Sequence, residues 1–424
     1  MLQVQTVSLQ ALKSYENNAR THSDVQVSQI ARSIERFGFT NPVLIDKSFV
    51  ILAGHGRVMA AKKLGLQEVP TICLDHMSEA EKKAYILADN KLAAKAGWDN
   101  DLLKIELAEL ATLDLDFDLT LTGFDTPEID LILYDEVAIT GDKLPSEKIS
   151  GEPAPSRVQF GDVWQLGEHK LFCGDSLKQE SFDILLGEEK VDLVFTDPPY
   201  NVPVQGHVGG NGSIKHAEFA LASGEMSSQE FTSFLKASFE LLSAYSKPGA
   251  IHYICMDWRH IAEIMTAGAL IYGELKNLCV WNKQLGGMGS LYRSQHELVF
   301  VFKSGDAPHI NNIELGKHGR NRTNIWDYPG VHITNKHRDD LKFHPTVKPV
   351  QMIADAIMDC SKRGSLILDC FAGSGSTLLA AHRTGRKAYV IEYEPRYCDV
   401  ILHRFETITG LKAVRIAGGT HVAQ

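Results

Sequence analysis

A short motif, Asp197-Pro198-Pro199-Tyr200, directly follows the apolar stretch 191–196, which has the pattern of a buried strand. Each proline restricts its own φ angle and lacks a backbone N–H, so we expect the carbonyls of Asp197 and Pro198 to point outward as hydrogen-bond acceptors. With the Asp197 carboxylate and the aromatic face of Tyr200, they form a cluster suited to an amine donor. The alternative is an ordinary structural turn, which the position at the end of a strand disfavours.

A second motif predicts a cradle for a nucleoside. The segment from Asp369 to Thr377 reads DCFAGSGST and also follows an apolar strand, and its glycines Gly373 and Gly375 let a ligand approach the backbone closely. The next expected strand ends at Glu392, 23 positions after Asp369 (392 − 369), where a carboxylate can bind two ribose hydroxyls. The Walker pattern is absent from this half of the chain, so hydrolysis of a nucleoside triphosphate there is disfavoured.

Both motifs require a sheet that brings their strands together. From residue 158 onward, apolar runs alternate with helical stretches such as 228–245 and 350–360, which predicts a doubly wound parallel sheet, that is, a Rossmann-like α/β fold. Ligands then bind at the carboxyl ends of the strands. The predicted strands lie within 169–175, 191–200, 250–257, 276–283, 297–305, 365–373 and 387–394.

The first 75 residues or so predict a second, smaller α/β unit. Its second helix begins at Gly54-His55-Gly56-Arg57, where backbone N–H groups and a guanidinium suit a phosphate. The predicted helices cover 25–37, ended by Gly38, and 58–64, and the predicted strands cover 42–46 and 50–53.

The net charge of −10 is distributed unevenly. Residues 1–66 carry 8 Lys/Arg against 4 Asp/Glu (+4), residues 67–150 carry 7 against 19 (−12), and residues 151–424 carry 28 against 30 (−2). This balance argues against a protein that coats nucleic acid non-specifically. We therefore predict a domain over 1–95, an acidic helical segment and linker over 96–156, and a domain over 157–424.

The composition, 44% hydrophobic and 23% charged residues over 424 positions, excludes a wholly disordered chain. No apolar run approaches the roughly 18 residues of a membrane helix and the start lacks a signal-peptide pattern, so we expect a cytoplasmic protein with no membrane partner. The seven cysteines are odd in number and never spaced C-x-x-C, which predicts neither disulfides nor a metal site. Cys255 and Cys370 follow strands, but with no histidine beside them we interpret both as core residues.

On these motifs, residues 158–412 resemble the beta class of amino-group DNA methyltransferases, which use S-adenosylmethionine to modify adenine N6 or cytosine N4. DPPY at 197–200 resembles the catalytic motif, DCFAGSGST at 369–377 the cofactor-binding motif, and HPTVKP at 344–349 the segment that commonly precedes the latter in this permuted order. The resemblance implies contacts to the cofactor adenine from Asp175 and to its ribose from Glu392. The further cofactor-binding residues that it implies are Thr346, Lys348, Asp369, Phe371, Gly373 and Gly375.

The resemblance also implies a reaction on double-stranded DNA without a covalent enzyme intermediate. The target base leaves the stack, Tyr200 offers a face for it, and Asp197 and the Pro198 carbonyl accept the N–H bonds of its amine. Adenine N6 is favoured over cytosine N4, because adenine-specific members usually carry Asp at the position of Asp197 and cytosine-specific members often carry Ser. RNA or a protein amide remains an alternative acceptor, and a homodimer is plausible on the resemblance.

A basic stretch with interleaved aromatics predicts where DNA is contacted. Target recognition is placed between Lys303 and Phe343, with a merely solvated loop as the alternative. The segment Asn201–Glu225 is interpreted as a mobile loop over the base pocket, and His207 and His216 within it as ordinary polar residues. The predicted DNA-contacting residues are Lys317, Arg320, Arg322, Lys336 and Arg338.

The N-terminal 75 residues or so resemble the ParB-like domain of chromosome-partition proteins, which is related to sulfiredoxin. The resemblance implies that the helix entry at 54–57 binds a nucleotide phosphate, and LADNKLA at 87–93 is faintly similar to the second half of such a site. The usual acid and second arginine are missing, which argues against nucleotide hydrolysis, and so is the sulfiredoxin cysteine. A docking surface for DNA or for assembly is the alternative for this domain.

A nucleotide-switched DNA-binding factor with an inactive methyltransferase half is the alternative for the chain, and the complete chemical motifs disfavour it.

Overall fold

The computed structural model of the chain forms two compact units, residues 1–133 and 134–424, which are described separately. The structure describes residues 2–113, 117–133, 156–201, 224–284, 286, 291–313, 321–330 and 347–417. Within the predicted acidic helical segment and linker over 96–156, residues 114–116 and 134–155 lie outside the described residues. None of the described helices is long and apolar enough to cross a membrane.

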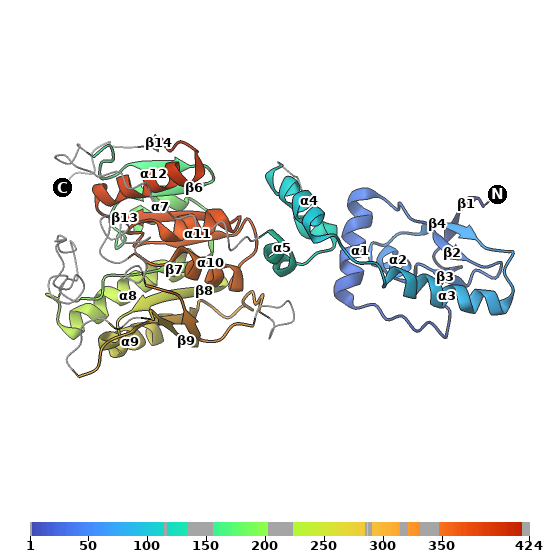
Figure 1. Ribbon diagram of the computed structural model, residues 1–424, viewed down its shortest axis with the longest axis horizontal. Helices are drawn as coiled ribbons and strands as arrows, with labels where there is room; N and C mark the ends of the chain where they lie inside the picture. Colours follow the sequence, from blue (N-terminus) through green and yellow to red (C-terminus); the bar gives the residue numbers. More distant parts are fainter. Residues whose placement is uncertain are drawn as a thin grey trace. The chain divides into compact units, whose positions relative to one another are not determined.

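The second unit is built on one ten-stranded sheet in the order β11-β9-β10-β8-β7-β12-β13-β6-β5-β14 (Figure 1). All seven strands predicted for this unit are confirmed. The strands are β5 (Val163–Leu166), β6 (His169–Cys173), β7 (Val191–Thr196), β8 (Ser246–Met256), β9 (Glu274–Asn282), β10 (His296–Lys303), β11 (Ile325–Asp327), β12 (Leu366–Asp369), β13 (Lys387–Glu392) and β14 (Val414–Ala417).

The sheet is mixed, whereas the apolar pattern predicted a wholly parallel one. Strands β6, β13, β12, β7 and β8 run parallel in that spatial order, as predicted. Strand β10, however, is antiparallel to both of its neighbours, β8 and β9, and β5 is antiparallel to β6 and β14. A strand buried on both faces has the same apolar run in either direction, so its direction cannot be deduced from composition.

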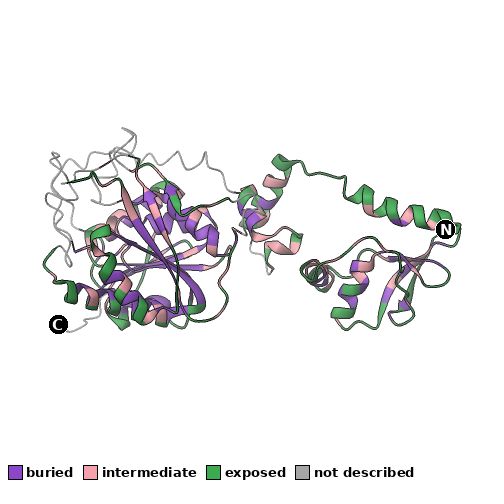
Figure 2. Cartoon of the chain, turned by 90° about the horizontal axis from the view of Figure 1, so that it is seen from below, coloured by how far each residue is buried: buried purple, intermediate pink, exposed green. Residues whose placement is uncertain are grey.

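Helices cover both faces of this sheet and split its core in two. Helices α10, α11 and α12 pack on one face, and α7, α8 and α9 on the other. Along β8, Tyr253 and Cys255 face the first group while Ile254 and Met256 face the second, as the alternation of a strand requires. Figure 2 shows the strands buried between the helices. The helices are α7 (Gln179–Leu186), α8 (Ser228–Tyr245), η3 (Trp258–His260), α9 (Ile261–Ile271), α10 (Val350–Cys360), α11 (Ser376–Arg383) and α12 (Pro395–Thr409).

The first unit contains a four-stranded sheet in the order β1-β4-β2-β3. The two predicted helices and two predicted strands are confirmed, and α1 ends at Gly38, whose φ of +78° suits glycine. Valine, leucine and isoleucine side chains from the strands form most of its main core cluster. The elements are β1 (Val4–Ser8), α1 (Asp24–Phe37), β2 (Val43–Ile45), β3 (Ile51–Ala53), α2 (His55–Lys63), β4 (Glu68–Cys73), α3 (Glu79–Ala93), α4 (Asn100–Thr112), η1 (Leu119–Thr122) and α5 (Thr126–Leu133).

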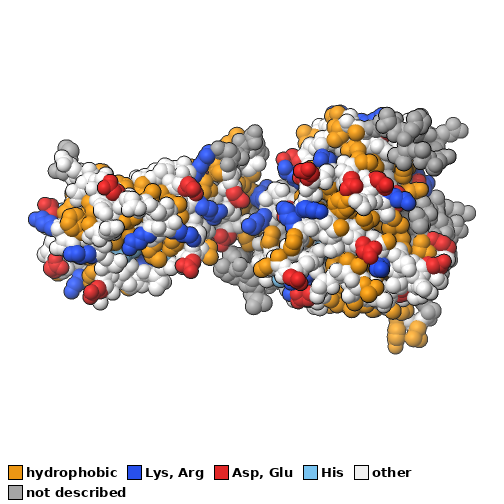
Figure 3. Space-filling model, turned by 180° about the vertical axis from the view of Figure 1, so that it is seen from behind, with side chains coloured by type: hydrophobic (Ala, Val, Ile, Leu, Met, Phe, Trp, Pro, Cys, Tyr) orange, Lys and Arg blue, Asp and Glu red, His pale blue; other side chains and the backbone are white. Residues whose placement is uncertain are grey.

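Charged side chains of both signs are scattered over the face drawn in Figure 3. Lysine and arginine are interspersed there with acidic and hydrophobic side chains. Helical structure in the acidic segment is confirmed for the residues that the structure describes, in α4, η1 and α5.

Candidate active site

Four neighbouring parallel strands carry an acidic residue at their carboxyl ends. Asp175 follows β6, Glu392 ends β13, Asp369 ends β12 and Asp197 follows β7. Because these strands are adjacent in the order β6-β13-β12-β7, the acids lie side by side at the carboxyl-terminal end of the sheet. The two sequence motifs, 169 residues apart or more, therefore meet at the edge where an open α/β sheet binds its ligands.

The Asp369 carboxylate organises the turn between β12 and α11. Its Oδ1 accepts hydrogen bonds from the Thr196 hydroxyl at 2.8 Å and the Phe371 N–H at 3.1 Å, and its Oδ2 accepts one from the Thr377 hydroxyl at 2.6 Å. Burial raises the pKa of Asp369 to about 6, although these three hydrogen bonds oppose that rise. The carboxylate thus ties the end of β7 and the start of α11 to the glycine turn.

Two glycines of this turn adopt left-handed backbone conformations. Gly373 has a φ of +53° and Gly375 a φ of +80°, where side-chain-bearing residues are strained. A Cβ on Gly375 would lie only 3.0 Å from the Ile401 side chain of α12. The Gly373 N–H points to the end of the neighbouring strand and donates to Glu392 Oε2 at 2.8 Å.

The Glu392 side chain is 8% exposed and accepts two backbone hydrogen bonds, from Gly373 and, at 3.0 Å, from Glu394. Burial raises the pKa of Glu392 to about 7. The Gly174 N–H donates to the Glu392 carbonyl at 3.0 Å, which holds the turn carrying Asp175 against the end of β13. Each Glu392 carboxylate oxygen retains a lone pair, so this corner of the sheet fits the hydroxyls of a nucleoside.

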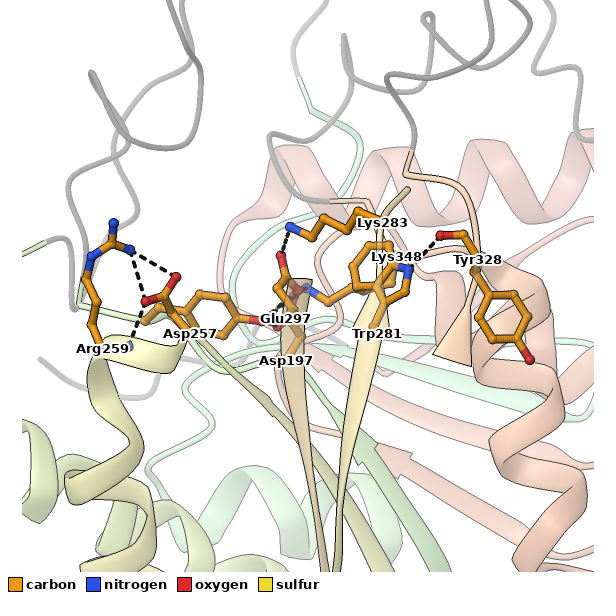
Figure 4. A network of polar contacts seen from close by, with 9 residues as sticks. Asp197, Asp257, Arg259, Trp281, Lys283, Glu297, Tyr328 and Lys348 are labelled. Carbon is orange, nitrogen blue, oxygen red and sulfur yellow. Dashed lines mark hydrogen bonds and ion pairs between the residues drawn. The ribbon is translucent and has the colours of Figure 1, made fainter. Parts of the chain in front are cut away.

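The Asp197 carboxylate is held by two donors from its own chain (Figure 4). Lys348 Nζ donates to Asp197 Oδ2 at 2.5 Å, and the Tyr200 hydroxyl donates to Asp197 Oδ1 through a short hydrogen bond. Lys348 Nζ also lies 3.2 Å from the Tyr200 hydroxyl oxygen. Asp197 therefore accepts an N–H from an ammonium group of its own chain.

A second carboxylate, Glu297, continues this network. Its Oε2 lies 3.0 Å from Lys348 Nζ and 3.3 Å from the Tyr200 hydroxyl, and its Oε1 accepts a short bond from Lys283 Nζ. Glu297 lies at the start of β10, Lys283 just beyond β9, and Lys348 just before α10. Sequence reasoning missed Glu297 and Lys283, although a glutamate opening the apolar run ELVFVF was a visible signal. Lys348, which the resemblance assigned to cofactor binding, has its ammonium in contact with Asp197 and Tyr200.

Burial and the charges of neighbouring groups together shift the pKa values of Asp197, Tyr200 and Glu297. Burial raises the pKa of Asp197, and Glu297 adds to the rise while Lys348 opposes it. Burial also raises the pKa of Tyr200 well above its ordinary value, which keeps the phenol protonated as a donor. Burial alone would raise the pKa of Glu297, but Lys283 and Lys348 together outweigh it and lower that pKa to about 2.

Two aromatic rings flank the Lys348 ammonium. Lys348 Nζ lies 5.4 Å from the ring centre of Tyr200 and 5.8 Å from that of Trp281. The Trp281 indole N–H donates to the Tyr328 carbonyl at 2.8 Å, which fixes the orientation of the ring at the end of β9. Trp281 is 3% exposed and belongs to the core, whereas Tyr200 is partly buried and can offer a face to a planar base. Trp281 was not among the residues singled out in the sequence.

The remaining nucleophile candidates belong to the core, as predicted. Cys255 and Cys370 are buried, and burial raises the pKa of both thiols, that of Cys370 to about 12. Neither thiol is therefore a thiolate near neutral pH.

The ends of the predicted loop over the base pocket are joined at Asn201. Its side chain accepts hydrogen bonds from the N–H groups of Gly224 and Met226 at 3.0 and 3.1 Å and donates to the Met226 carbonyl at 2.7 Å. The segment thus leaves and returns beside Tyr200. Residues 202–223, with His207 and His216, lie outside the described residues.

Arg322 is the one predicted DNA-contacting residue that falls within the described ranges. Its guanidinium donates to Asp359 Oδ2 at 3.0 Å and to the Tyr328 hydroxyl at 2.7 Å, and lies 3.4 Å from Asp355 Oδ2. It thereby holds the segment around β11 against α10. Lys317, Arg320, Lys336, Arg338 and the predicted cofactor residue Thr346 lie outside the described residues.

In the first unit, the predicted phosphate turn lies at the start of α2. Gly54 has a φ of +100° and precedes the first helical residue, His55, so the N–H groups of His55 and Gly56 lie in the first turn of the helix. Arg57 donates to the carbonyls of Asn41 and Pro42 at 2.6 and 2.9 Å, so its guanidinium is engaged by the chain itself. The α3 residues Tyr85 and Asp89, of which Asp89 belongs to the segment LADNKLA, act electrostatically on Arg57.

Three family models match the chain. Residues 191–403 match the model described as DNA methylase, for the N6/N4 type, and residues 1–91 match the ParB N-terminal domain. Residues 101–159 match the ParB-methyltransferase HTH domain, in the region where the sequence predicted an acidic helical segment and linker.

Individual relatives likewise match either a ParB-like part or a methyltransferase part of the chain. The ParB-like nuclease domain-containing protein YnaK of Escherichia coli (strain K12) is 53% identical over 75 residues, 18% of this chain and 86% of that protein. The type II methyltransferase M.HpaI of Haemophilus parainfluenzae is 23% identical over 254 residues, 57% of this chain and 75% of that protein. Among solved structures, PvuII DNA methyltransferase (cytosine-N4-specific) is 18% identical, covers 59% of this chain and 94% of its own, and has a TM-score of 0.45.

Proposed function

Because the chain belongs to the N6/N4 family of DNA methylases, with a ParB N-terminal domain and a ParB-methyltransferase HTH domain, we propose that it methylates N6 of adenine in double-stranded DNA. An amino-group DNA methyltransferase needs an acceptor for the exocyclic amine of a flipped-out base. The observation that carries the proposal is the Asp197 carboxylate, which lies beside the Tyr200 ring and accepts an N–H from an ammonium group at 2.5 Å.

We propose S-adenosylmethionine as the cofactor bound beside Asp175, Asp369 and Glu392. When bound, it supplies an electrophilic methyl group. Glu392 would accept the ribose hydroxyls with its remaining lone pairs, and Asp175 would lie toward the adenine. The backbone around Phe371, Gly373 and Gly375 would approach the ligand, because the two glycines leave the turn without side chains. Asp369 holds this turn in shape through its three hydrogen bonds.

The base-binding side of the site is proposed from the chain's own donors and rings. Asp197 and the Pro198 carbonyl accept the amine N–H bonds, and Tyr200 offers a stacking face that offsets part of the few kcal/mol needed for flipping. Hydrogen bonding to a carboxylate raises the electron density on the amine nitrogen. The buried Asp197, with its raised pKa, can also accept the proton that the methylated amine releases.

Adenine is proposed over cytosine because residue 197 is aspartate, the residue that adenine-specific members of the family usually carry at this position. Cytosine N4 is the alternative, since its amine presents the same two N–H donors to the same acceptors.

A nucleotide is the second proposed ligand, at residues 54–57 of the ParB N-terminal domain. The helix N-terminus at Gly54 supports phosphate binding through backbone N–H groups. The engagement of Arg57 by the Asn41 and Pro42 carbonyls means that its guanidinium must exchange partners to contribute. Calorimetric titration of nucleoside triphosphates into the chain, with Gly56→Val as the control, tests this site.

The main proposal is tested by incubating the protein with tritiated S-adenosylmethionine and unmethylated genomic DNA, then separating the nucleosides by chromatography. We expect the label in N6-methyladenine with the natural chain and none with Asp197→Ala. Label in N4-methylcytosine would retain the mechanism and change the base. Cofactor binding without labelled DNA would contradict DNA as the acceptor.

A further inference from the structure

The Asp197 site contains more charge than amine recognition requires. Two carboxylates, Asp197 and Glu297, and two ammonium groups, Lys348 and Lys283, form a continuous chain of contacts (Figure 4). The side chains of Lys348, Glu297 and Asp197 are only 6%, 11% and 19% exposed. Burying a charge is costly unless it is paired, so each member of this network depends on the others.

We propose that Glu297 is a positioning residue for methyl transfer, which holds the Lys348 ammonium beside Asp197 and offsets its charge. This inference rests on the proposed function, since it assigns a role in the same reaction. Glu297 acts through Lys348 and Tyr200, the same two donors that bind Asp197. Its Oε2 lies 3.0 Å from Lys348 Nζ and 3.3 Å from the Tyr200 hydroxyl oxygen.

The fold explains how Glu297 reaches this place. Strand β10 is antiparallel to its neighbours, so its first residues lie at the edge where the parallel strands end. Glu297 is opposite Trp281 in the pairing of β10 with β9, and Lys283 follows two residues later. Only the reversed direction of β10 brings a strand-opening glutamate to the carboxyl edge of the sheet.

The charge balance explains why a second carboxylate is needed. The amine nitrogen gains positive charge as it attacks a methyl group, and an uncompensated ammonium beside it would oppose that change. With Asp197 and Glu297 ionised against Lys348 and Lys283, the formal sum is zero; without Glu297 it is +1. Charges in a buried site are screened weakly, so this difference is felt at the reacting nitrogen.

Glu297 also provides a place for Lys348 when the base arrives. Lys348 Nζ donates to Asp197 Oδ2, an acceptor that the amine would also use. Because Glu297 Oε2 already contacts Lys348 at 3.0 Å, the ammonium can shift its hydrogen bonds toward Glu297 without losing a charged partner.

Glu274 offers a matched control on the same pair of strands. It lies at the opposite end of β9 and is also flanked by two lysines, Lys276 at 2.9 Å and Lys303 at 3.4 Å. Glu274→Gln therefore removes a glutamate between two ammonium groups at a distance from the site. A general effect of losing such a group would appear in both variants.

The first test compares methyl transfer by Glu297→Gln and Glu274→Gln. We expect kcat to fall about 10- to 100-fold in Glu297→Gln only, with the affinity for S-adenosylmethionine within about twofold of the natural chain. The acid limb of the kcat profile should move to lower pH, because removing a neighbouring negative charge lowers the pKa of Asp197. The other titratable groups that act on or alongside Asp197 are Tyr200, Lys348, Cys255 and Asp369.

The second test asks whether Glu297 acts through Lys348. In a Lys348→Met background, the added Glu297→Gln change should cause no further loss of kcat, since the ammonium to be held is already gone. A further loss as large as that seen in the natural chain would overturn the proposed route through Lys348.

A third measurement does not depend on activity. Nitrogen-15 NMR of the lysine ammonium groups should show a protected Lys348 signal, assigned by its disappearance in Lys348→Met. We expect the signal to be lost or shifted in Glu297→Gln and kept in Glu274→Gln; an unchanged signal overturns the inference whatever the activity. A natural chain that transfers no methyl group contradicts the proposed function instead, and the NMR result still decides the role of Glu297.

Discussion

The ionisation of Glu392 predicts that cofactor affinity depends on pH near neutrality. Burial raises the pKa of this carboxyl from an ordinary 4.5 to about 7. Ribose hydroxyls donate hydrogen bonds to a carboxylate, so S-adenosylmethionine should bind the ionised form in preference. The sign follows directly: affinity is greatest above pH 7 and declines as the pH falls through 7.

The magnitude follows from the ionised fraction of Glu392. With a pKa of about 7, about nine tenths of the free chain is ionised at pH 8 and about one tenth at pH 6. The apparent Kd should therefore rise about tenfold from pH 8 to pH 6, which corresponds to about 1.4 kcal/mol.

Calorimetry at pH 6, 7 and 8 measures this change, with Glu392→Gln as the test variant and Glu240→Gln as the control. Glu240 lies on α8, where its partner is Lys236. The α-amino group of the ligand titrates in the same range, but its contribution is common to all three chains. We expect weaker binding and a flat residual profile in Glu392→Gln only. A natural chain whose Kd follows the same profile as Glu392→Gln would refute the role given to this carboxylate.

Three further outcomes are expected from the same structure. Asp197→Ala should abolish methyl transfer while calorimetry shows cofactor affinity within about twofold, because the amine acceptor and the nucleoside corner belong to different strands. Gly373→Val should prevent cofactor binding in calorimetry, whereas Gly187→Val, which is strained by a similar φ of +58° in open space, should not. Arg322→Ala should lower the free energy of unfolding by about 1.5–3 kcal/mol in a denaturant titration, since it removes a charged hydrogen-bond donor from the buried Asp359; a change below about 0.5 kcal/mol would contradict this.

The strand-forming runs could be predicted because burial on both faces produces long apolar stretches. Helices 228–245 and 350–360 were predicted with the bounds that the structure has, and the carboxyl-edge location of both motifs followed from the parallel arrangement. The direction of β10 could not be predicted, because direction leaves no trace in an apolar run. That reversal carries Glu297 into the site, so a local ambiguity concealed a residue of the network.

The partners of the predicted residues depend on contacts between distant segments. Lys348 is 151 residues from Asp197 in sequence and Glu297 is 97 residues from Tyr200, and no spacing rule relates such positions. The resemblance placed Lys348 by its motif, near the glycine turn, and only the structure brings its ammonium to Asp197. Likewise, the basic and aromatic pattern around Arg322 predicted DNA contact, but did not reveal the carboxylates of α10 that bind its guanidinium.

Three of the four acids at neighbouring strand ends differ in the kind of donor that they accept from, and this difference is consistent with the separate roles proposed for them. Asp369 accepts hydrogen bonds from two buried threonine hydroxyls and one backbone N–H, all of which belong to the framework of the turn. Glu392 accepts two backbone N–H groups and keeps lone pairs for a ligand. Asp197 accepts from the Lys348 ammonium and the Tyr200 hydroxyl, and the ammonium has a second carboxylate partner, Glu297, at 3.0 Å to which it can shift. A carboxylate whose donors can be exchanged is the one able to accept, hold and release an incoming amine.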